Sequence, residues 1–194
     1  MARKQAADYE QRREAIVARA AGLFAKRGYA SASVADLAEA CELSKSLIYH
    51  YYPSKEDILF EVMESHLLML TGAVETVAGS SAAPERKLRD LTHRFMGLYV
   101  GAQDRHKVLL NELDQLPPAR RDTIVQRQRR LIRDTEALIS EVRPDLATTR
   151  AKRPLTMLYF GMINWTHTWF DPAGPFSPDE VADLAVGLVL GKGV

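Results

Sequence analysis

The sequence predicts an all-α protein, and three observations support this prediction. Apolar residues recur at helical spacing along nearly the whole chain, and no run of about four to eight residues alternates between apolar and polar side chains. Residues typical of helix starts and ends separate the periodic segments. With 194 residues, the chain can bury a core without disulfides, and its single cysteine cannot form an internal one. We expect about nine helices, arranged as a three-helix domain over residues 1–54 and a helical bundle over residues 55–194.

The N-terminal domain is predicted from paired helix start and stop signals. An apolar face between residues 16 and 24 marks the first helix, and Gly28 ends it because glycine readily adopts the left-handed conformation of a C-terminal cap. Ser33 is a typical N-cap residue for a short second helix, and Asp36 places negative charge in its first turn. A third helix is expected after a tight turn within residues 33–52.

Longer helices are predicted for the rest of the chain. Ser54 and Asp57 repeat the start signal of the second helix, and the residues from Ser177 to Glu180 combine a serine N-cap, a proline and a glutamate at helix-starting positions. The segment 153–170 is apolar nearly all round, so we expect it to be buried on several sides. The predicted elements are a helix over 55–77, apolar helical segments over 88–99 and 108–116, an arginine-rich helix ending near Pro144, the segment 153–170 and a last helix ending near Leu190.

Overall charge alone argues against nucleic-acid binding, because 26 basic and 25 acidic side chains leave a net charge of +1. The charge is unevenly distributed, however, since residues 1–55 carry nine basic and six acidic side chains and the remainder carries 17 and 19. No stretch of about 18 apolar residues occurs, and no cysteine- or histidine-rich metal motif is present. We therefore expect a cytoplasmic protein with no membrane partner, no metal and no cofactor.

Residues 33–52 are typical of two short helices joined by a tight turn. Such helices cross steeply, so small and apolar side chains are needed where they touch. The residues expected at this contact are Ala35, Leu37, Ala38, Ala40, Leu43 and Ile48. The polar side chains left pointing outward, which suit the phosphates and base edges of a DNA major groove, are those of Lys45, Ser46, Tyr49 and His50.

At these positions the sequence resembles the TetR family of transcriptional regulators. The resemblance covers about residues 9–60 and is carried by Gly28-Tyr29, residues 33–38, Leu43-Ser44-Lys45 and residues 48–55. It implies a DNA-binding helix-turn-helix domain with phosphate contacts from some residues and base-edge or backbone contacts from the recognition helix. The phosphate-contacting positions are Ser33, Ser44 and Lys55, and the recognition-helix positions are Lys45, Ser46, Tyr49 and His50. Tyr51 is included among the DNA-binding residues, although a core aromatic is an equal alternative.

Three residues depart from the family pattern. Glu42 stands at a turn position where the family usually has glycine, so a non-glycine residue must adopt the turn conformation. Ser46 and Leu47 stand where Gly-Thr or similar pairs are common, so no operator sequence follows from the resemblance. Nearby, we expect Tyr52 to be a core aromatic and Cys41 to be a small buried side chain, because no second cysteine could pair with it.

Aromatic and methionine side chains gather in two segments of the C-terminal domain, with polar side chains between them. Core packing is the simpler interpretation for each residue alone, but apolar side chains with a few buried polar groups are also typical of a small-molecule site. The sequence therefore predicts an effector pocket formed by Phe95, Met96, Tyr99, Asn111, Tyr159, Phe160, Asn164, Trp165, Thr168 and Trp169.

Arginines are frequent in the same domain. One interpretation is a solvated helix face with acidic partners. The alternative is a phosphate-binding rim at the mouth of the pocket, formed by Arg129, Arg130 and Arg133. Residues 159–180 also resemble the C-terminal region of TetR-type repressors of fatty, aromatic or steroid-derived acid catabolism, and this resemblance implies an acyl-CoA thioester as inducer.

These features predict a ligand-responsive repressor that binds a palindromic operator as a homodimer and releases it on binding a small-molecule inducer. The resemblance implies that the last two long helices pair with those of the partner. The small residues that would allow close approach there are Gly161, Ala182, Ala185 and Gly187.

Two other functions are weighed against this prediction. A repressor of an efflux gene induced by hydrophobic drugs would differ only in ligand and target. An all-helical enzyme would have to use His167 with Asp171 or Ser177, but no nucleophile and base occur at matched spacing. We therefore expect no enzymatic activity.

Overall fold

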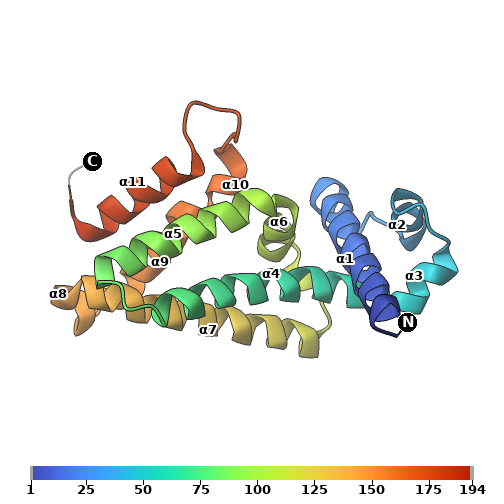
Figure 1. Ribbon diagram of the computed structural model, residues 1–194, viewed down its shortest axis with the longest axis horizontal. Helices are drawn as coiled ribbons and strands as arrows, with labels where there is room; N and C mark the ends of the chain where they lie inside the picture. The colour runs from blue at the N-terminus through green and yellow to red at the C-terminus, as the bar shows by residue number, and fades with distance from the viewer. Residues whose placement is uncertain (1, 193–194) are drawn as a thin grey trace. The chain divides into compact units, whose positions relative to one another are not determined.

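The computed structural model describes residues 2–192, with the side chains of residues 7–146 and 148–192 (Figure 1). This part of the chain is helical and contains no strand, as predicted. Two single-turn helices, α8 and α10, add to the expected number. The helices are α1 (Ala2–Arg27), α2 (Val34–Ala40), α3 (Lys45–Tyr51), α4 (Lys55–Ala78), α5 (Pro84–Gly101), α6 (Gln103–Asn111), the 3-10 helix η1 (Leu113–Gln115), α7 (Pro118–Val142), α8 (Pro144–Ala147), α9 (Lys152–Asn164), α10 (Thr166–Trp169) and α11 (Pro178–Leu190).

The chain forms two compact units. The first comprises the residues up to His66 together with Asp104–Ile124, and the second comprises Leu67–Gln103 and the residues from Val125 onward. Helices α4 and α7 contribute residues to both units. The expected domain boundary between residues 54 and 55 lies inside the first unit, and it stays a prediction.

The N-terminal helices pack around a small apolar core. Gly28 follows α1 with a φ angle of 79°, so the expected glycine stop is confirmed. Ser33 caps α2 by accepting a hydrogen bond from the Asp36 N–H group. The core of this region consists of Ile16, Phe24, Leu37, Ala38 and Ile48, all of which are buried. The expectation for Ala35 and Ala40 is wrong, because both lie on the exposed side of α2.

A buried polar network joins α6 to α1 and α4 within the first unit. Arg105 forms an ion pair with Glu14 of α1, and it donates a 3.3 Å hydrogen bond to Ser65 of α4. The next residue, His106, is hydrogen-bonded through Nδ1 to Nε2 of His66 at 3.1 Å. Both imidazoles are buried. Burial lowers the pKa of His66 to about 4, and the positive charge of Arg105 acts in the same direction.

The second unit has its core between α5, α9 and α11. Helix α11 lies along α5 (Figure 1), and buried residues of both helices, such as Leu88, Leu91, Ala182 and Val186, form part of this core. The predicted start of α11 is confirmed, since Ser177 and Glu180 form a complete capping box. Gly191 ends the helix at a φ angle of 67°.

The apolar segment 153–170 differs from its expected structure. The continuous helix ends at Asn164, and Trp165 separates it from the short α10. Only part of α9 faces the core, where Tyr159, Phe160 and Ile163 are buried. Leu158 and Trp165 are 67% and 64% exposed, so burial on several sides was the wrong expectation. The apolar character of this segment instead produces an exposed apolar face.

None of the helices formed by residues 2–192 combines the length and apolar character needed to cross a membrane.

Candidate functional site

The exposed face of α3 carries the polar side chains predicted for the recognition helix. Ser44 accepts a hydrogen bond from the Leu47 N–H group at 3.2 Å and thereby caps the first turn. Ile48 is fully buried and anchors the opposite face of the helix. The side chains left on the solvent side are those of Lys45, Ser46, Tyr49 and His50. A cation, a hydroxyl, a phenol and an imidazole thus share one surface, as DNA groove contacts require.

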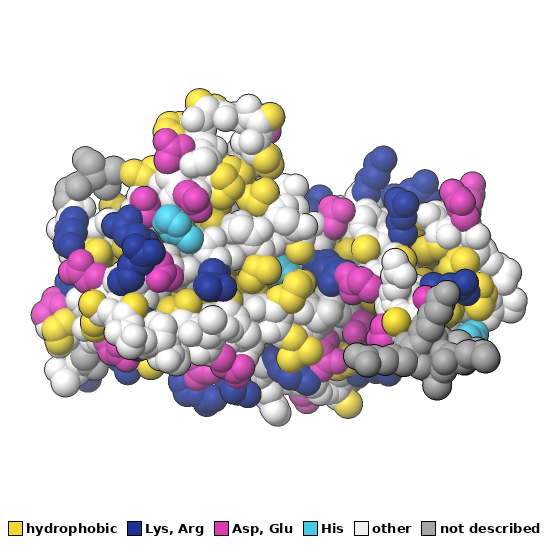
Figure 2. Space-filling model, viewed as in Figure 1, with side chains coloured by type: hydrophobic (Ala, Val, Ile, Leu, Met, Phe, Trp, Pro, Cys, Tyr) yellow, Lys and Arg dark blue, Asp and Glu magenta, His cyan; other side chains and the backbone are white. Residues whose placement is uncertain are grey.

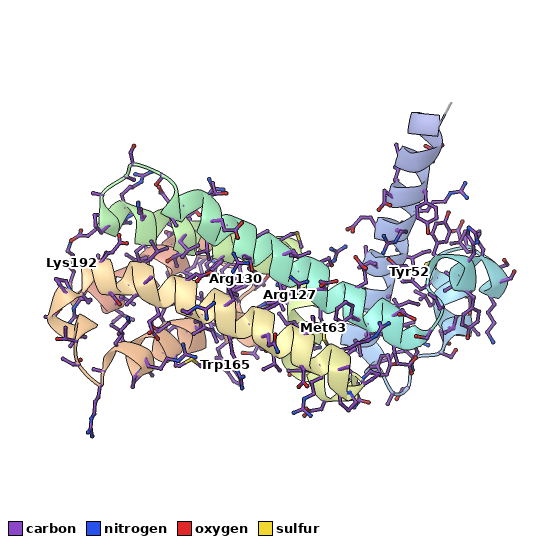
Figure 3. The ribbon with its side chains drawn as sticks, turned by 90° about the horizontal axis from the view of Figure 1, so that it is seen from below. Tyr52, Met63, Arg127, Arg130, Trp165 and Lys192 are labelled. Atoms are coloured by element: carbon purple, nitrogen blue, oxygen red, sulfur yellow. The ribbon has the colours of Figure 1, made fainter. Side chains whose placement is uncertain are left out.

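The tyrosines at the end of α3 divide between the surface and the core. Tyr49 is 46% exposed, whereas Tyr52 is buried beside α1, where the Arg13 guanidinium lies 5.3 Å from its ring centroid (Figure 3). Tyr51 is half-buried and packs on Tyr9 of α1 with 4.8 Å between ring centroids. The core assignment of Tyr52 is confirmed. Tyr51 packs on α1 while part of it stays accessible, so its DNA contact stays a prediction.

The turn between α2 and α3 has the strained backbone that the sequence predicts. Glu42 has a φ angle of 55°, which lies in the left-handed region that glycine would occupy at lower cost. The preceding residue, Cys41, is half-buried, which is less burial than expected. Partial burial raises the pKa of the Cys41 thiol and so favours the less reactive protonated form.

Two residues predicted to contact phosphate are engaged within the protein. The Lys55 ammonium donates hydrogen bonds of 2.8 Å to the carbonyl oxygens of Tyr29 and Ala32, and it lies 4.0 Å from the Tyr29 ring centroid. Ser33 shares its hydroxyl group with Asp36 in the α2 cap. Lys55 fixes the turn that precedes α2, and its phosphate contact stays a prediction. Ser33 positions the helix through its cap.

The predicted effector pocket is largely filled by its own side chains. Phe95 and Tyr159 are fully buried, and the Tyr159 hydroxyl is hydrogen-bonded to that of Thr92 at 2.9 Å. A cavity of about 10 Å³ beside Tyr99 is too small for an organic effector. The core interpretation therefore holds for the five residues Phe95, Met96, Tyr99, Tyr159 and Phe160.

The remaining predicted effector residues do not join this cluster. Trp165 (Figure 3), Thr168 and Trp169 are exposed. Asn111 is exposed and belongs to the first unit. Asn164 is half-buried, and its Oδ1 atom has no hydrogen-bond partner among the described residues. These residues therefore do not form one pocket in this structure.

The arginines of α7 form a solvated, ion-paired surface. Dark blue side chains gather along this helix in Figure 2, and the exposed residues there include Arg129, Arg130 and Arg133. Arg130 pairs with Glu75 at 2.9 Å and with Asp134 at 3.5 Å. Arg133 lies 3.8 Å from Asp134. The structure thus favours the solvated-face alternative for Arg130 and Arg133 over a phosphate-binding rim.

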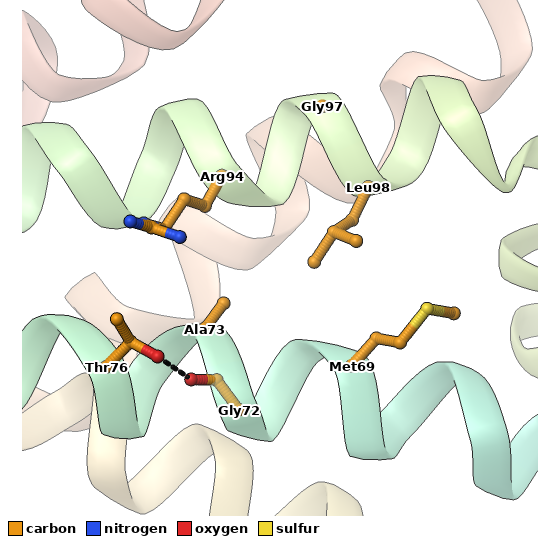
Figure 4. Close-up of a pocket in the computed structure, with 7 residues that line it drawn as sticks. All are labelled: Met69, Gly72, Ala73, Thr76, Arg94, Gly97 and Leu98. Carbon is orange, nitrogen blue, oxygen red and sulfur yellow. Dashed lines mark hydrogen bonds between the residues drawn. The ribbon is translucent and has the colours of Figure 1, made fainter.

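A groove that the sequence did not predict lies between α4 and α5 in the second unit. It has a volume of about 480 Å³, within the usual range for small-molecule sites (Figure 4). The groove is lined by Met69, Gly72, Ala73, Thr76, Arg94, Gly97 and Leu98. The one sequence signal was a glycine on each helix, which is uninformative until the spacing of the helices is known.

Among the described residues, no cluster of three or more histidine, cysteine or acidic side chains could hold a metal ion. The two surface features that carry the site are the polar face of α3 and the α4/α5 groove.

Comparison with protein families assigns both parts of the chain to one family. Residues 16–62 match the model described as bacterial regulatory proteins, tetR family. Residues 81–192 match the model described as tetracyclin repressor-like, C-terminal domain. Together the two models cover the helix-turn-helix and most of the helices that follow it.

Individual relatives are similar to this chain along most of their length. A solved TetR-family regulator from Bordetella parapertussis is 40% identical, with a TM-score of 0.87 over 93% of this chain and 94% of that chain. AibR, solved in complex with isovaleryl coenzyme A and operator DNA, is 26% identical, with a TM-score of 0.81 over 94% and 100%. The transcriptional repressor KstR2 of Mycolicibacterium smegmatis is 26% identical over 93% of this chain and 89% of its own. With both family models and these full-length similarities, the chain belongs to the TetR family of bacterial transcriptional regulators.

Proposed function

We propose that this protein is a homodimeric repressor that binds operator DNA through α3 and releases it when an acyl-CoA thioester binds. The observation that carries the proposal is the exposed polar face of α3. Its backbone is fixed by the Ser44 cap and by buried Ile48, and Lys45 and Tyr49 remain free to meet a DNA groove. A preformed rigid surface of this kind loses little conformational entropy on binding.

Support for the effector class comes from the relatives. AibR has been solved with isovaleryl coenzyme A and operator DNA in the same complex. KstR2 of Mycobacterium tuberculosis, with 22% identity and a TM-score of 0.81, shares the fold and is described as a ketosteroid transcriptional regulator. The AibR complex contains ligand and DNA together. The DNA-binding assay must therefore detect both weaker and tighter binding when a thioester is added.

Support for the homodimer comes from the exposed apolar face of α9 and α11. Leu158 on α9, Trp165 directly after α9, and Leu184 and Leu188 on α11 are exposed in the single chain. Such a face is typical of a protein interface. Ala182 and Ala185 are buried within the chain, so they are not available for close helix approach. Gly161 is exposed, and Gly187 is partly exposed.

Operator binding is tested by fluorescence anisotropy with the DNA upstream of the protein's own gene. Lys45→Ala and Tyr49→Ala should each weaken binding by about tenfold or more, because each removes a groove contact without disturbing the core. Lys107→Ala removes an exposed cation from α6 and serves as the matched control. Unchanged affinity in both α3 variants would show that another surface binds DNA.

The effector is tested by titrating the protein–operator complex with isovaleryl-, octanoyl- and phenylacetyl-CoA. We expect at least one thioester to release the DNA, since an inducer needs only to favour the conformation that does not bind. Release by a hydrophobic drug, with none by any thioester, would support the efflux-repressor alternative. Tighter DNA binding with a thioester would reverse the proposed direction of regulation.

The dimer is tested by light scattering on a variant with both Leu184→Glu and Leu188→Glu. Two buried charges in the interface should produce a monomer. Leu68→Glu places the same charge at an exposed leucine on α4 and should leave the dimer intact. If the double variant is still a dimer, the interface lies elsewhere.

A further inference from the structure

The groove between α4 and α5 is open at positions where each helix carries a glycine. A Cβ atom built on Gly72 or on Gly97 would meet no atom within 4 Å outside the local backbone. Small residues usually allow two helices to approach closely, but here they leave space. The resulting groove of about 480 Å³ is large enough for a small organic molecule.

The groove is apolar at one end and cationic at the other. Figure 4 shows Met69 and Leu98 near one end and Arg94 and Thr76 near the other. Thr76 donates its hydroxyl proton to the Gly72 carbonyl oxygen at 2.7 Å, so Arg94 is the principal donor for a ligand. From Met69 to Thr76, an α-helix rises by roughly 10 Å.

Arg94 differs from the other two arginines of α5 in having no acidic partner among the described residues. Arg86 pairs with Asp90 at 2.8 Å, and Arg89 pairs with Asp183 of α11. The Arg94 side chain is exposed and extends from α5 toward α4 (Figure 4). A guanidinium without a partner at the edge of an apolar groove complements an anion, because it can donate two parallel hydrogen bonds to a carboxylate or phosphate.

We propose that the α4/α5 groove binds an amphipathic anion, with its apolar part against Met69 and Leu98 and its carboxylate or phosphate on Arg94. This proposal rests on the proposed function, because it takes the amphipathic anion to be the effector that releases the DNA. A free carboxylic acid of about eight carbons fits within the groove. A CoA thioester with a phosphate on Arg94 would place its pantetheine arm along the groove and its acyl chain beyond Met69 and Leu98.

Calorimetry with octanoate, octanoyl-CoA and octan-1-ol tests the site directly on the full-length protein. Octan-1-ol has the same apolar chain without the charge, so it should bind at least about tenfold more weakly than the better of the two anions. Binding of the neutral alcohol as tightly as both anions would overturn the role of Arg94. Preference for octanoate or for octanoyl-CoA identifies the carboxylate or the phosphate as the group on Arg94.

Two groove variants and two matched controls locate the site. Arg94→Gln removes the cation, and Gly97→Leu fills the open space; each should weaken anion binding by at least about tenfold. Arg86→Gln removes another cation from α5, and Gly101→Leu adds the same side chain at an open position outside the groove. Both controls should bind as the wild type does. Equal binding by all four variants would overturn the site.

A DNA-release assay with the same probes separates this proposal from the proposed function. If the wild type and both groove variants release operator DNA equally, the groove assignment is wrong and the effector function stands. If octanoyl-CoA binds in the groove without affecting DNA, the site stands and the proposed regulation is overturned. If the wild type binds none of the three probes, the groove proposal is overturned whatever the DNA assay shows.

Discussion

The polar face of α3 and the aromatic cluster of α5 and α9 were both predicted to bind a partner, but the first is exposed and the second is buried. On α3, Lys45 and Tyr49 are exposed above a helix anchored by Ile48. In the aromatic cluster, Phe95 and Tyr159 are fully buried, and the Tyr159 hydroxyl is satisfied by Thr92. Aromatic side chains are therefore accessible for binding on α3, whereas in the cluster they pack the core.

The difference comes from how strongly local sequence determines which helix face is covered. In the helix-turn-helix, the N-caps of Ser33 and Ser44 and the buried Leu37 and Ile48 orient both short helices. In the second unit, coverage of α5 depends on α9 and α11, which are distant in sequence. One face of α5 is filled by these helices, whereas the face with Arg94 and Gly97 borders a groove.

The largest expected effect tests whether the aromatic cluster is a core. Phe95→Ala should lower the free energy of unfolding by about 3–5 kcal/mol, because it leaves a cavity in a fully buried site. Trp169→Ala removes a ring that is 55% exposed and should cost about 1 kcal/mol or less. Urea unfolding measures both. Similar small losses in the two variants would mean that the cluster is loosely packed and open to ligands.

Sequence reasoning predicted the helices and the face of α3 but not the pocket. The capping box of Ser177 and Glu180 starts α11, and Gly28 ends α1. Both are local sequence signals, and both are confirmed. The interruption between α9 and α10 at Trp165 has no proline or glycine to signal it. The apolar helical pattern of residues 153–170 therefore predicts one continuous segment. The groove at Arg94 depends on the spacing between two helices, which no local pattern contains.

A second test compares the exposed His50 with the buried His66. Because the pKa of His66 is lowered by burial to about 4, below its ordinary value of 6.5, the unfolded chain takes up a proton first as pH falls. The contribution of His66 to stability is therefore full above about pH 6.5 and is lost as the pH falls toward 4. The predicted loss is about 3 kcal/mol, measured by urea unfolding across this range.

Matched variants assign this pH dependence. His66→Gln keeps a hydrogen-bonding side chain beside His106 but does not titrate, so the free energy of unfolding should depend less steeply on pH. His50→Gln makes the same substitution at an exposed site and serves as the matched control. The same slope in the His66 variant as in the wild type would show that other groups control the pH dependence.

The smallest effect concerns the turn that presents α3. Glu42→Gly should raise the free energy of unfolding by about 0.5–1 kcal/mol, since glycine adopts a φ angle of 55° without the steric cost that a Cβ atom imposes. Glu39→Gly removes the same charged side chain inside α2, where glycine should destabilise the helix by about 0.5–1 kcal/mol. The two variants change net charge equally, so opposite signs in urea unfolding isolate the backbone effect. If both variants destabilise the protein, contacts of the Glu42 side chain outweigh its backbone strain, and the turn depends on that residue for more than its conformation.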